Sequence, residues 1–174
     1  MALVTGGCTN SGSSSGADGY ITGSGSVVRI DEPDREAAPE VSGDTLRGGT
    51  LSLVDYRDQV VVLNVWASWC PPCRAEADDF QQASQELRDV AFVGLNVRDE
   101  PSAAKAFVRT HDIGYPSIVS QDGSVLLRFY GLLNMSSLPS TVIVDPQGRV
   151  AALVVGPATK TTLKGLVGEI EAEA

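Results

Sequence analysis

The chain is poor in the residues that build metal centres and disulfide frameworks. It has one histidine and three cysteines, so a four-ligand zinc site of cysteine and histidine would need all of them. It has no apolar run long enough to cross a membrane as a helix. Basic residues are also scarce, 13 against 22 acidic ones, and a net charge of −9 argues against a nucleic-acid-binding protein.

The composition that remains is that of one ordinary domain with an extension. Hydrophobic residues make up 43% of the 174 positions, which is enough for a soluble core. Residues 9–26 consist mostly of Gly, Ser and Thr and predict a flexible tether, although an uninformative tail fits the composition equally well. We therefore divide the chain into an N-terminal extension, residues 1–26, and a domain, residues 27–174.

Small residues precede Cys8, in the order Thr5-Gly6-Gly7-Cys8. This pattern resembles the end of a bacterial lipoprotein signal, whose cysteine becomes lipidated, although Thr5 stands where an aliphatic residue is usual. We expect an upstream signal sequence and a lipid anchor at Cys8. The alternative is a free cysteine in a tail.

The most informative stretch joins an apolar run to a pair of cysteines. Residues 60–66 are almost all apolar and rich in β-branched side chains, which predicts a central strand covered on both faces. Pro71 and Pro72 suit the first turn of a helix, where a missing N–H costs nothing. Cys70 and Cys73 are therefore expected at the junction of strand and helix.

That junction favours thiol chemistry. Unpaired backbone N–H groups and the positive end of the helix dipole stabilise a thiolate. We expect Cys70 to be the exposed, acidified nucleophile and Cys73 to resolve the mixed disulfide formed at Cys70. Two intervening residues let the pair close a small ring.

A carboxyl group is expected beside the thiols. Residues at spacings of three and four share one helix face, which would carry Cys73, Glu76, Phe80, Ala83 and Leu87. Glu76 would thus point inward with no cation beside it in sequence. We expect its pKa to be raised and the group to exchange protons with the cysteines.

Trp69-Cys70-Pro71-Pro72-Cys73 resembles the active site of the thioredoxin superfamily. Residues 64–69 and 73–76 resemble the extracytoplasmic TlpA/ResA-like branch, which carries a Glu three residues after the second cysteine, as at Glu76. General thioredoxins instead carry an acidic residue where this chain has Asn64. The branch commonly has a proline where this chain has Asp78, so the helix need not be kinked there.

The resemblance covers residues 39–172 and implies an α/β thioredoxin fold, with a central mixed β-sheet flanked by helices and an N-terminal β-hairpin. It also implies a substrate-binding surface. Pro139 would be the cis-proline facing the cysteines, and the backbone of Leu138 would hydrogen-bond an extended substrate peptide. Trp69, Pro71 and Pro72 would complete that surface.

Other patterns place the remaining elements. Strands are expected at residues 27–30, 90–97, 141–144 and 149–155, a hairpin turning at Gly48-Gly49 within residues 45–53, and helices over residues 102–111 and at the C-terminus. Residues 113–130 should approach the active site from the side. We interpret His111 as a packed or rim residue rather than a catalytic one.

The resemblance implies a monomeric thiol-disulfide oxidoreductase at the outer face of the bacterial cell membrane. No metal or organic cofactor is required, because electrons pass by exchange between cysteine pairs. A ResA-like protein would reduce disulfides in apocytochrome c before haem attachment and take electrons from a membrane thiol carrier of the CcdA or DsbD type.

Three alternatives stay open. The same site could install disulfides in exported proteins, although a nearby Glu76 disfavours a strongly acidic Cys70. Cys70, Cys73 and His111 could hold Cu(I) in a copper chaperone, but such chaperones of this fold generally place three residues between their cysteines. A purely structural disulfide is the third, and the flanking Trp66 and Trp69 argue against it.

Overall fold

The computed structural model describes residues 17–22, 25–133 and 137–173. Within these ranges one mixed sheet has the strand order β1-β2-β9-β8-β5-β6-β7. Its strands are β1 (Ala17–Thr22), β2 (Gly25–Ile30), β5 (Val61–Trp66), β6 (Ala91–Val97), β7 (Ser117–Ser120), β8 (Ser140–Val144) and β9 (Val150–Val155). The fold class implied by the resemblance, a mixed thioredoxin-like sheet with helices, is confirmed.

The three strands at the β7 end of the sheet are parallel. β5 pairs with β6 and β6 with β7 in parallel, while β8 pairs with β5 in antiparallel orientation. Every residue of β5 and β6 is buried, as continuous apolar runs require of strands covered on both faces. Helix α1 (Pro71–Glu86) connects β5 to β6, and α2 (Pro101–Thr110) connects β6 to β7.

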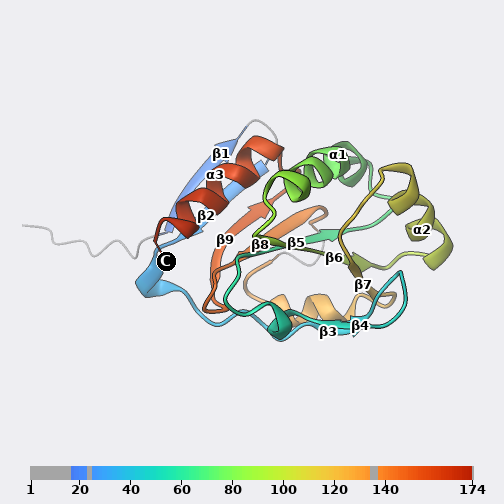
Figure 1. The fold of residues 1–174 in the computed structure, drawn as a ribbon, viewed down its shortest axis with the longest axis horizontal. Coiled ribbons are helices and arrows are strands. Elements are labelled where there is room, and N and C mark those ends of the chain that lie inside the picture. Colours follow the sequence, from blue (N-terminus) through green and yellow to red (C-terminus); the bar gives the residue numbers. More distant parts are fainter. Residues whose placement is uncertain (1–16, 23–24, 134–136, 174) are drawn as a thin grey trace, which may run out of the picture.

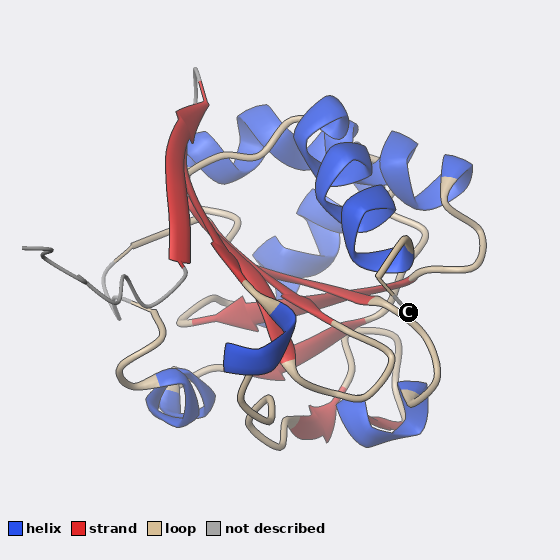
Figure 2. Ribbon diagram, turned by 90° about the vertical axis from the view of Figure 1, so that its left-hand side faces the viewer, coloured by secondary structure: helices blue, strands red, loops and turns tan. Residues whose placement is uncertain are grey.

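Two hydrophobic layers enclose the sheet. Figures 1 and 2 show the three helices on one side of it and the hairpin of β3 (Ser42–Asp44) and β4 (Thr50–Ser52) on the other. Alternate residues face opposite layers at the start of β5, since Val62 and the preceding Val60 join one cluster and Val61 and Leu63 the other. Short 3-10 helices complete the elements, at Glu32–Asp34 (η1), Leu53–Tyr56 (η2) and Ser124–Phe129 (η3).

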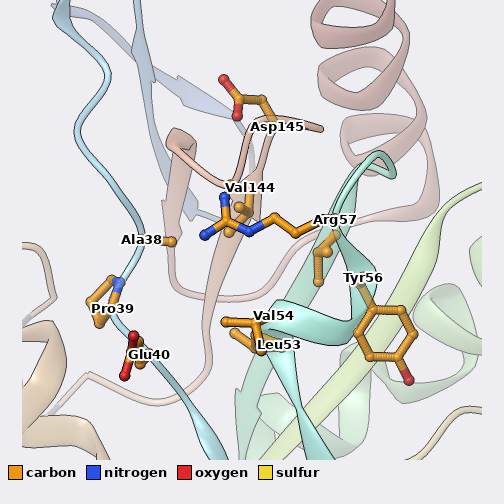
Figure 3. Close-up of a pocket in the computed structure, with 11 residues that line it drawn as sticks. Ala38, Pro39, Glu40, Leu53, Val54, Tyr56, Arg57, Val144 and Asp145 are labelled. Atoms are coloured by element: carbon orange, nitrogen blue, oxygen red, sulfur yellow. The ribbon is translucent and has the colours of Figure 1, made fainter.

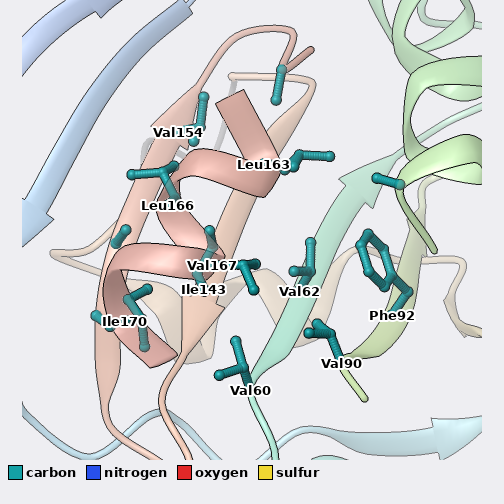
Figure 4. Close-up of a cluster of buried hydrophobic side chains, with 14 of the residues drawn as sticks. Val60, Val62, Val90, Phe92, Ile143, Val154, Leu163, Leu166, Val167 and Ile170 are labelled. Carbon is teal, nitrogen blue, oxygen red and sulfur yellow. The ribbon is translucent and has the colours of Figure 1, made fainter. Parts of the chain in front are cut away.

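The C-terminal part of the chain follows the sequence pattern. β8 and β9 are antiparallel, and the turn between them closes with a hydrogen bond from the Gly148 amide to the Asp145 carbonyl. The helix expected at the C-terminus is α3 (Lys160–Glu171), and it buries four apolar residues at helical spacing, Leu163, Leu166, Val167 and Ile170. Figure 4 shows this stripe packed on Val60, Val62 and their neighbours in the sheet.

The hairpin predicted at Gly48-Gly49 is also confirmed. β3 and β4 pair in antiparallel orientation, and both glycines have positive φ, +90° and +76°. Backbone conformations of that kind are accessible to glycine at little steric cost.

The sheet extends further towards the N-terminus than the sequence pattern indicates. β1 lies inside residues 9–26, the expected tether, and pairs with β2 along its whole length. Strand pairing uses main-chain groups that any composition supplies, so a lack of apolar residues does not exclude it. Cys8, residues 9–16 and residues 23–24 lie outside the described residues.

A buried ion-pair cluster ties the segment after β2 to the C-terminal half of the domain. The Arg35 guanidinium lies 3.4 Å from the Asp145 carboxylate and also contacts Glu173. Arg149 approaches the same Asp145 carboxylate at 2.8 Å. Arg35 and Asp145 are both buried, and Asp145 has two cationic partners.

In the described part of the chain, no helix is long and apolar enough to cross a membrane.

Candidate active site

The cysteine pair sits where β5 runs into α1, as predicted. Cys70 and Cys73 form a disulfide with a Cα–Cα distance of 5.3 Å. Cys70 is the N-cap residue of α1, and its Sγ accepts a hydrogen bond from the Cys73 amide at 3.2 Å. Pro71 and Pro72 precede Cys73 and have no N–H, so the Cys73 amide is the first donor that this helix end can direct at Cys70.

The expected exposure of Cys70 is wrong for the disulfide form of the protein. Only 2% of Cys70 and 1% of Cys73 is accessible to solvent. Tertiary packing causes this burial, because apolar side chains from distant parts of the chain share one cluster with the cysteine pair, among them Leu46 and Phe107. The residues exposed at the surface of the site are instead Trp69, which is 53% exposed, and the two prolines of the Cys-Pro-Pro-Cys motif.

Glu76 faces inward, as its helix position predicts. It is 3% exposed, and among the described residues no cation pairs with it. Its Oε1 accepts a hydrogen bond from Asn64 Nδ2 at 2.8 Å, and its Oε2 accepts one from the Ala158 amide at 2.9 Å. Desolvation raises the pKa of Glu76 to about 8, although both hydrogen bonds lower it. A carboxyl group that still holds its proton near neutral pH thus lies one helical turn from Cys73.

Neither hydrogen-bond partner of Glu76 was identified from the sequence. Asn64 was noted only for its departure from general thioredoxins, yet it is the one polar residue within β5 and so marks a buried polar contact. Ala158 acts through its main chain, which no side-chain pattern reveals. Tyr115 was also missed as a neighbour: burial, and then the charge of Glu76, raise the pKa of the Tyr115 hydroxyl.

The peptide bond between Leu138 and Pro139 is cis, as the resemblance implies. Pro139 immediately precedes β8, and its carbonyl accepts a hydrogen bond from the Gly156 amide at 3.0 Å. Leu138 is partly buried and packs against the cluster that contains both cysteines. The structure therefore brings Leu138 together with the disulfide from a separate part of the chain. Substrate binding at Leu138 and Pro139 stays a prediction.

His111 is a rim residue, as interpreted from the sequence. It caps the C-terminus of α2, its ring lies 4.6 Å from that of Phe107, and its Nδ1 is 2.9 Å from an Asp78 carboxylate oxygen. Over the described ranges, no three side chains of His, Cys, Asp or Glu gather closely enough to hold a metal ion. His111 and the cysteines thus form no such group in the disulfide form, and the copper alternative stays a prediction.

Two open hollows flank the loop before Cys70. One, of about 390 Å³, is lined by Ser68, Arg74 and residues of α2, and the other, of about 420 Å³, is lined by Ser68, Trp69 and the turn after β6. A third pocket lies elsewhere, between the segment at Pro39 and the 3-10 helix η2 (Figure 3). That pocket measures about 30 Å³, room for a single water molecule, and contains no cysteine.

Comparison with known proteins agrees with this geometry. The model of the AhpC/TSA family matches residues 35–153. The thioredoxin-like protein YneN of Bacillus subtilis is 33% identical over 149 residues, 83% of this chain and 84% of YneN. The thiol-disulfide oxidoreductase ResA of the same organism is 27% identical over 128 residues, 72% of this chain and 69% of ResA.

Solved structures of similar proteins have the same fold. A DsbF homologue from Corynebacterium diphtheriae superposes with a TM-score of 0.78 at 35% identity, over 82% of this chain and 92% of that one. A secreted thiol-disulfide isomerase from Corynebacterium glutamicum gives 0.78 at 33% identity, over 83% and 90%.

Proposed function

Since the chain belongs to the AhpC/TSA family and is a thiol-disulfide oxidoreductase, we propose that it is a ResA-like reductant of cysteine pairs in exported proteins. The observation that carries this proposal is a buried disulfide one helical turn from a carboxyl group whose pKa is about 8. An ordinary thiol has a pKa near 8.5, so the carboxyl group and a thiol can exchange a proton at little cost.

The reaction transfers two electrons and two protons to the substrate. In the reduced protein, the Cys70 thiol has lost its proton to water, and the Cys70 thiolate attacks one sulfur of the substrate disulfide. The other substrate sulfur leaves as a thiolate and takes up a proton from water. The ionised form of Glu76, which a pKa of about 8 keeps accessible near neutral pH, then takes the proton of Cys73, and the Cys73 thiolate attacks the Cys70 sulfur. The second substrate sulfur leaves as a thiolate, and Glu76 returns the proton to it. The Cys70–Cys73 disulfide remains, and no cofactor takes part.

The charge that Glu76 acquires on ionising supports the proposed direction of transfer. When Glu76 ionises beside the pair, its negative charge opposes a second negative charge on sulfur and disfavours the thiolate. Strong oxidants of this kind depend on a stabilised reduced form. A nearby carboxylate therefore supports a reductant. We further propose apocytochrome c as the substrate, a membrane thiol carrier of the CcdA or DsbD type as electron donor, and Cys8 as a lipid anchor outside the cytoplasmic membrane.

The reduction potential of the Cys70–Cys73 pair tests this direction. The protein is equilibrated with defined ratios of reduced to oxidised glutathione or dithiothreitol, and the thiol fraction is measured by alkylation. We expect a value near or below about −220 mV, in the range of glutaredoxins and thioredoxin. A value near about −120 mV, typical of a dedicated oxidant, would contradict a reductant.

A disulfide-forming or isomerising role is the second candidate. It is supported by the similarity to a DsbF homologue and to a secreted thiol-disulfide isomerase. Incubation of the disulfide form with a reduced, unfolded secretory protein separates the two. An oxidant transfers its disulfide to that protein in stoichiometric amounts, whereas a reductant leaves it reduced.

A further inference from the structure

Asp99 forms a buried hydrogen-bond centre beside the active-site loop. It follows β6 and is 8% exposed. Each of its two carboxylate oxygens accepts two hydrogen bonds. Oδ2 accepts from the Ser68 amide at 2.6 Å and from Asn96 Nδ2 at 2.9 Å. Oδ1 accepts from the Ser68 hydroxyl at 2.7 Å and from the Glu100 amide at 2.9 Å. The hydrogen-bonding capacity of this carboxylate is thereby filled.

The same contacts hold Ser68 by its main chain and its side chain. Its amide and hydroxyl donate to Asp99, and its carbonyl accepts from Arg74 Nε at 2.8 Å. The next residue is held as well, because Trp69 Nε1 donates to the Arg98 carbonyl at 2.8 Å. The turn after β6 is thus bonded to the two residues that precede Cys70.

These bonds fix the part of the site that a large partner meets first. The disulfide itself is almost inaccessible, whereas Trp69 is 53% exposed. The two hollows of about 390 and 420 Å³ both include Ser68 and Ala103 in their walls, so the loop held by Asp99 separates them. An exposed aromatic side chain held in one orientation loses little conformational entropy on binding and is a strong contact for a polypeptide.

We propose that Asp99 is a positioning residue for polypeptide substrates. Acting through Ser68, it holds the loop and Trp69 in the conformation that binds an extended polypeptide carrying a disulfide. A small dithiol does not need that surface and reacts independently of it. This inference rests on the proposed exchange with protein disulfides and adds the residue that organises recognition.

The test compares Asp99→Asn with wild type on two substrates. The first is insulin, a disulfide-bonded polypeptide, and the second is dithiothreitol, which reduces the Cys70–Cys73 disulfide directly. Asn cannot accept all four hydrogen bonds, so we expect KM for insulin to rise about tenfold, the scale of one or two lost hydrogen bonds. The rate with dithiothreitol should change less than about twofold, within the effect of a neutral substitution.

A spectroscopic readout follows Trp69 itself. Iodide quenches exposed tryptophan, and Trp66 is buried, so the quenching reports Trp69. We expect stronger quenching in Asp99→Asn, because the indole is no longer held against the turn. In a Trp69→Ala background, Asp99→Asn should add little further loss on insulin, since both changes remove the same contact.

Asp55→Asn is the matched control, because Asp55 also accepts a backbone hydrogen bond at the start of a short helix, from the Ser52 amide at 3.3 Å, and lines neither hollow. Asp55→Asn should react with insulin and with dithiothreitol at the wild-type rates. If Asp99→Asn does not fold, Ser68→Ala removes only the 2.7 Å hydroxyl bond and should raise KM for insulin about threefold.

Equal losses with insulin and dithiothreitol, or an unchanged KM for insulin, would overturn the positioning role. A wild type that reduces neither insulin nor a disulfide-bonded apocytochrome c would instead overturn the proposed function. The two failures are thereby distinguishable.

Discussion

The buried Glu76 makes the stability of the disulfide form depend on pH, and this dependence can be calculated from its surroundings. Desolvation raises the pKa of Glu76 from 4.5 to about 8 in the folded protein. In the unfolded chain the group ionises near pH 4.5. Between these two values the unfolded state releases a proton that the folded state keeps, so stability falls as pH rises. The stabilisation that the protonated Glu76 contributes is fully present below pH 4.5 and decreases as the pH rises, until it is lost at about pH 8.

The magnitude follows from the shift. Each pKa unit corresponds to about 1.4 kcal/mol, so the free energy of unfolding should fall by about 5 kcal/mol across this window and by about 3 kcal/mol by pH 7. Glu76→Gln removes the titration and keeps the shape. Gln can accept from the Ala158 amide and donate to Asn64 if the Asn64 amide group turns over, so residue 76 keeps both of its hydrogen-bond partners.

The assay is urea unfolding of the disulfide form at pH 5, 6, 7 and 8. We expect wild type to lose about 1.4 kcal/mol more per pH unit than Glu76→Gln between pH 5 and 8. Glu171→Gln, which removes an exposed carboxylate from α3, is the control and should follow wild type. If wild type and Glu76→Gln have the same slope, Glu76 is ionised in the folded protein and the role of its burial is refuted.

Three further predictions concern the same site and its support. Glu76→Gln should lower the pKa of the Cys70 thiol and slow disulfide exchange with substrate, measured by alkylation rate against pH and by insulin reduction; no change in either would leave Glu76 a packing residue. Cys73→Ser should trap substrate on Cys70 as a mixed disulfide visible on non-reducing gels, while Cys70→Ser should not; the reverse result would exchange the two roles. Arg35→Met should lower the free energy of unfolding by about 3 kcal/mol in urea, because Arg35 is the buried partner of Asp145. Arg149→Met should lower it by about 1 kcal/mol, because Arg149 is more exposed. Equal losses would contradict this ranking.

Elements whose signal is local could be predicted from the sequence. β5 and β6 are continuous apolar runs, α3 has an apolar stripe at helical spacing, and the turn after β8 has its proline and glycine where a turn needs them. The inward direction of Glu76 belongs to this group, because it follows from spacing along one helix. Local periodicity determines which side of an element is buried.

Features set by contacts between distant segments could not be predicted. The Ala158 amide reaches Glu76 across 82 residues, and the Ser68 hydroxyl reaches Asp99 across 31. The burial of Cys70 depends on Leu46 and Phe107, which the fold brings to the pair. β1 pairs with β2 through main-chain groups that its composition does not reveal. Each of these features depends on which segments the fold places side by side, and a single sequence does not encode that in any local pattern.

Different parts of the fold set the distance between Glu76 and Cys73 and the pKa of Glu76. Glu76 and Cys73 belong to α1, so helix geometry alone keeps them one turn apart. The groups that set the pKa of Glu76 come from other elements, Asn64 from β5 and Ala158 from the segment before α3. A change in either donor would alter the pKa of the acid without moving it away from the cysteine. An acid on β5, where general thioredoxins carry theirs, would instead change its distance from Cys73 whenever strand and helix shift against each other.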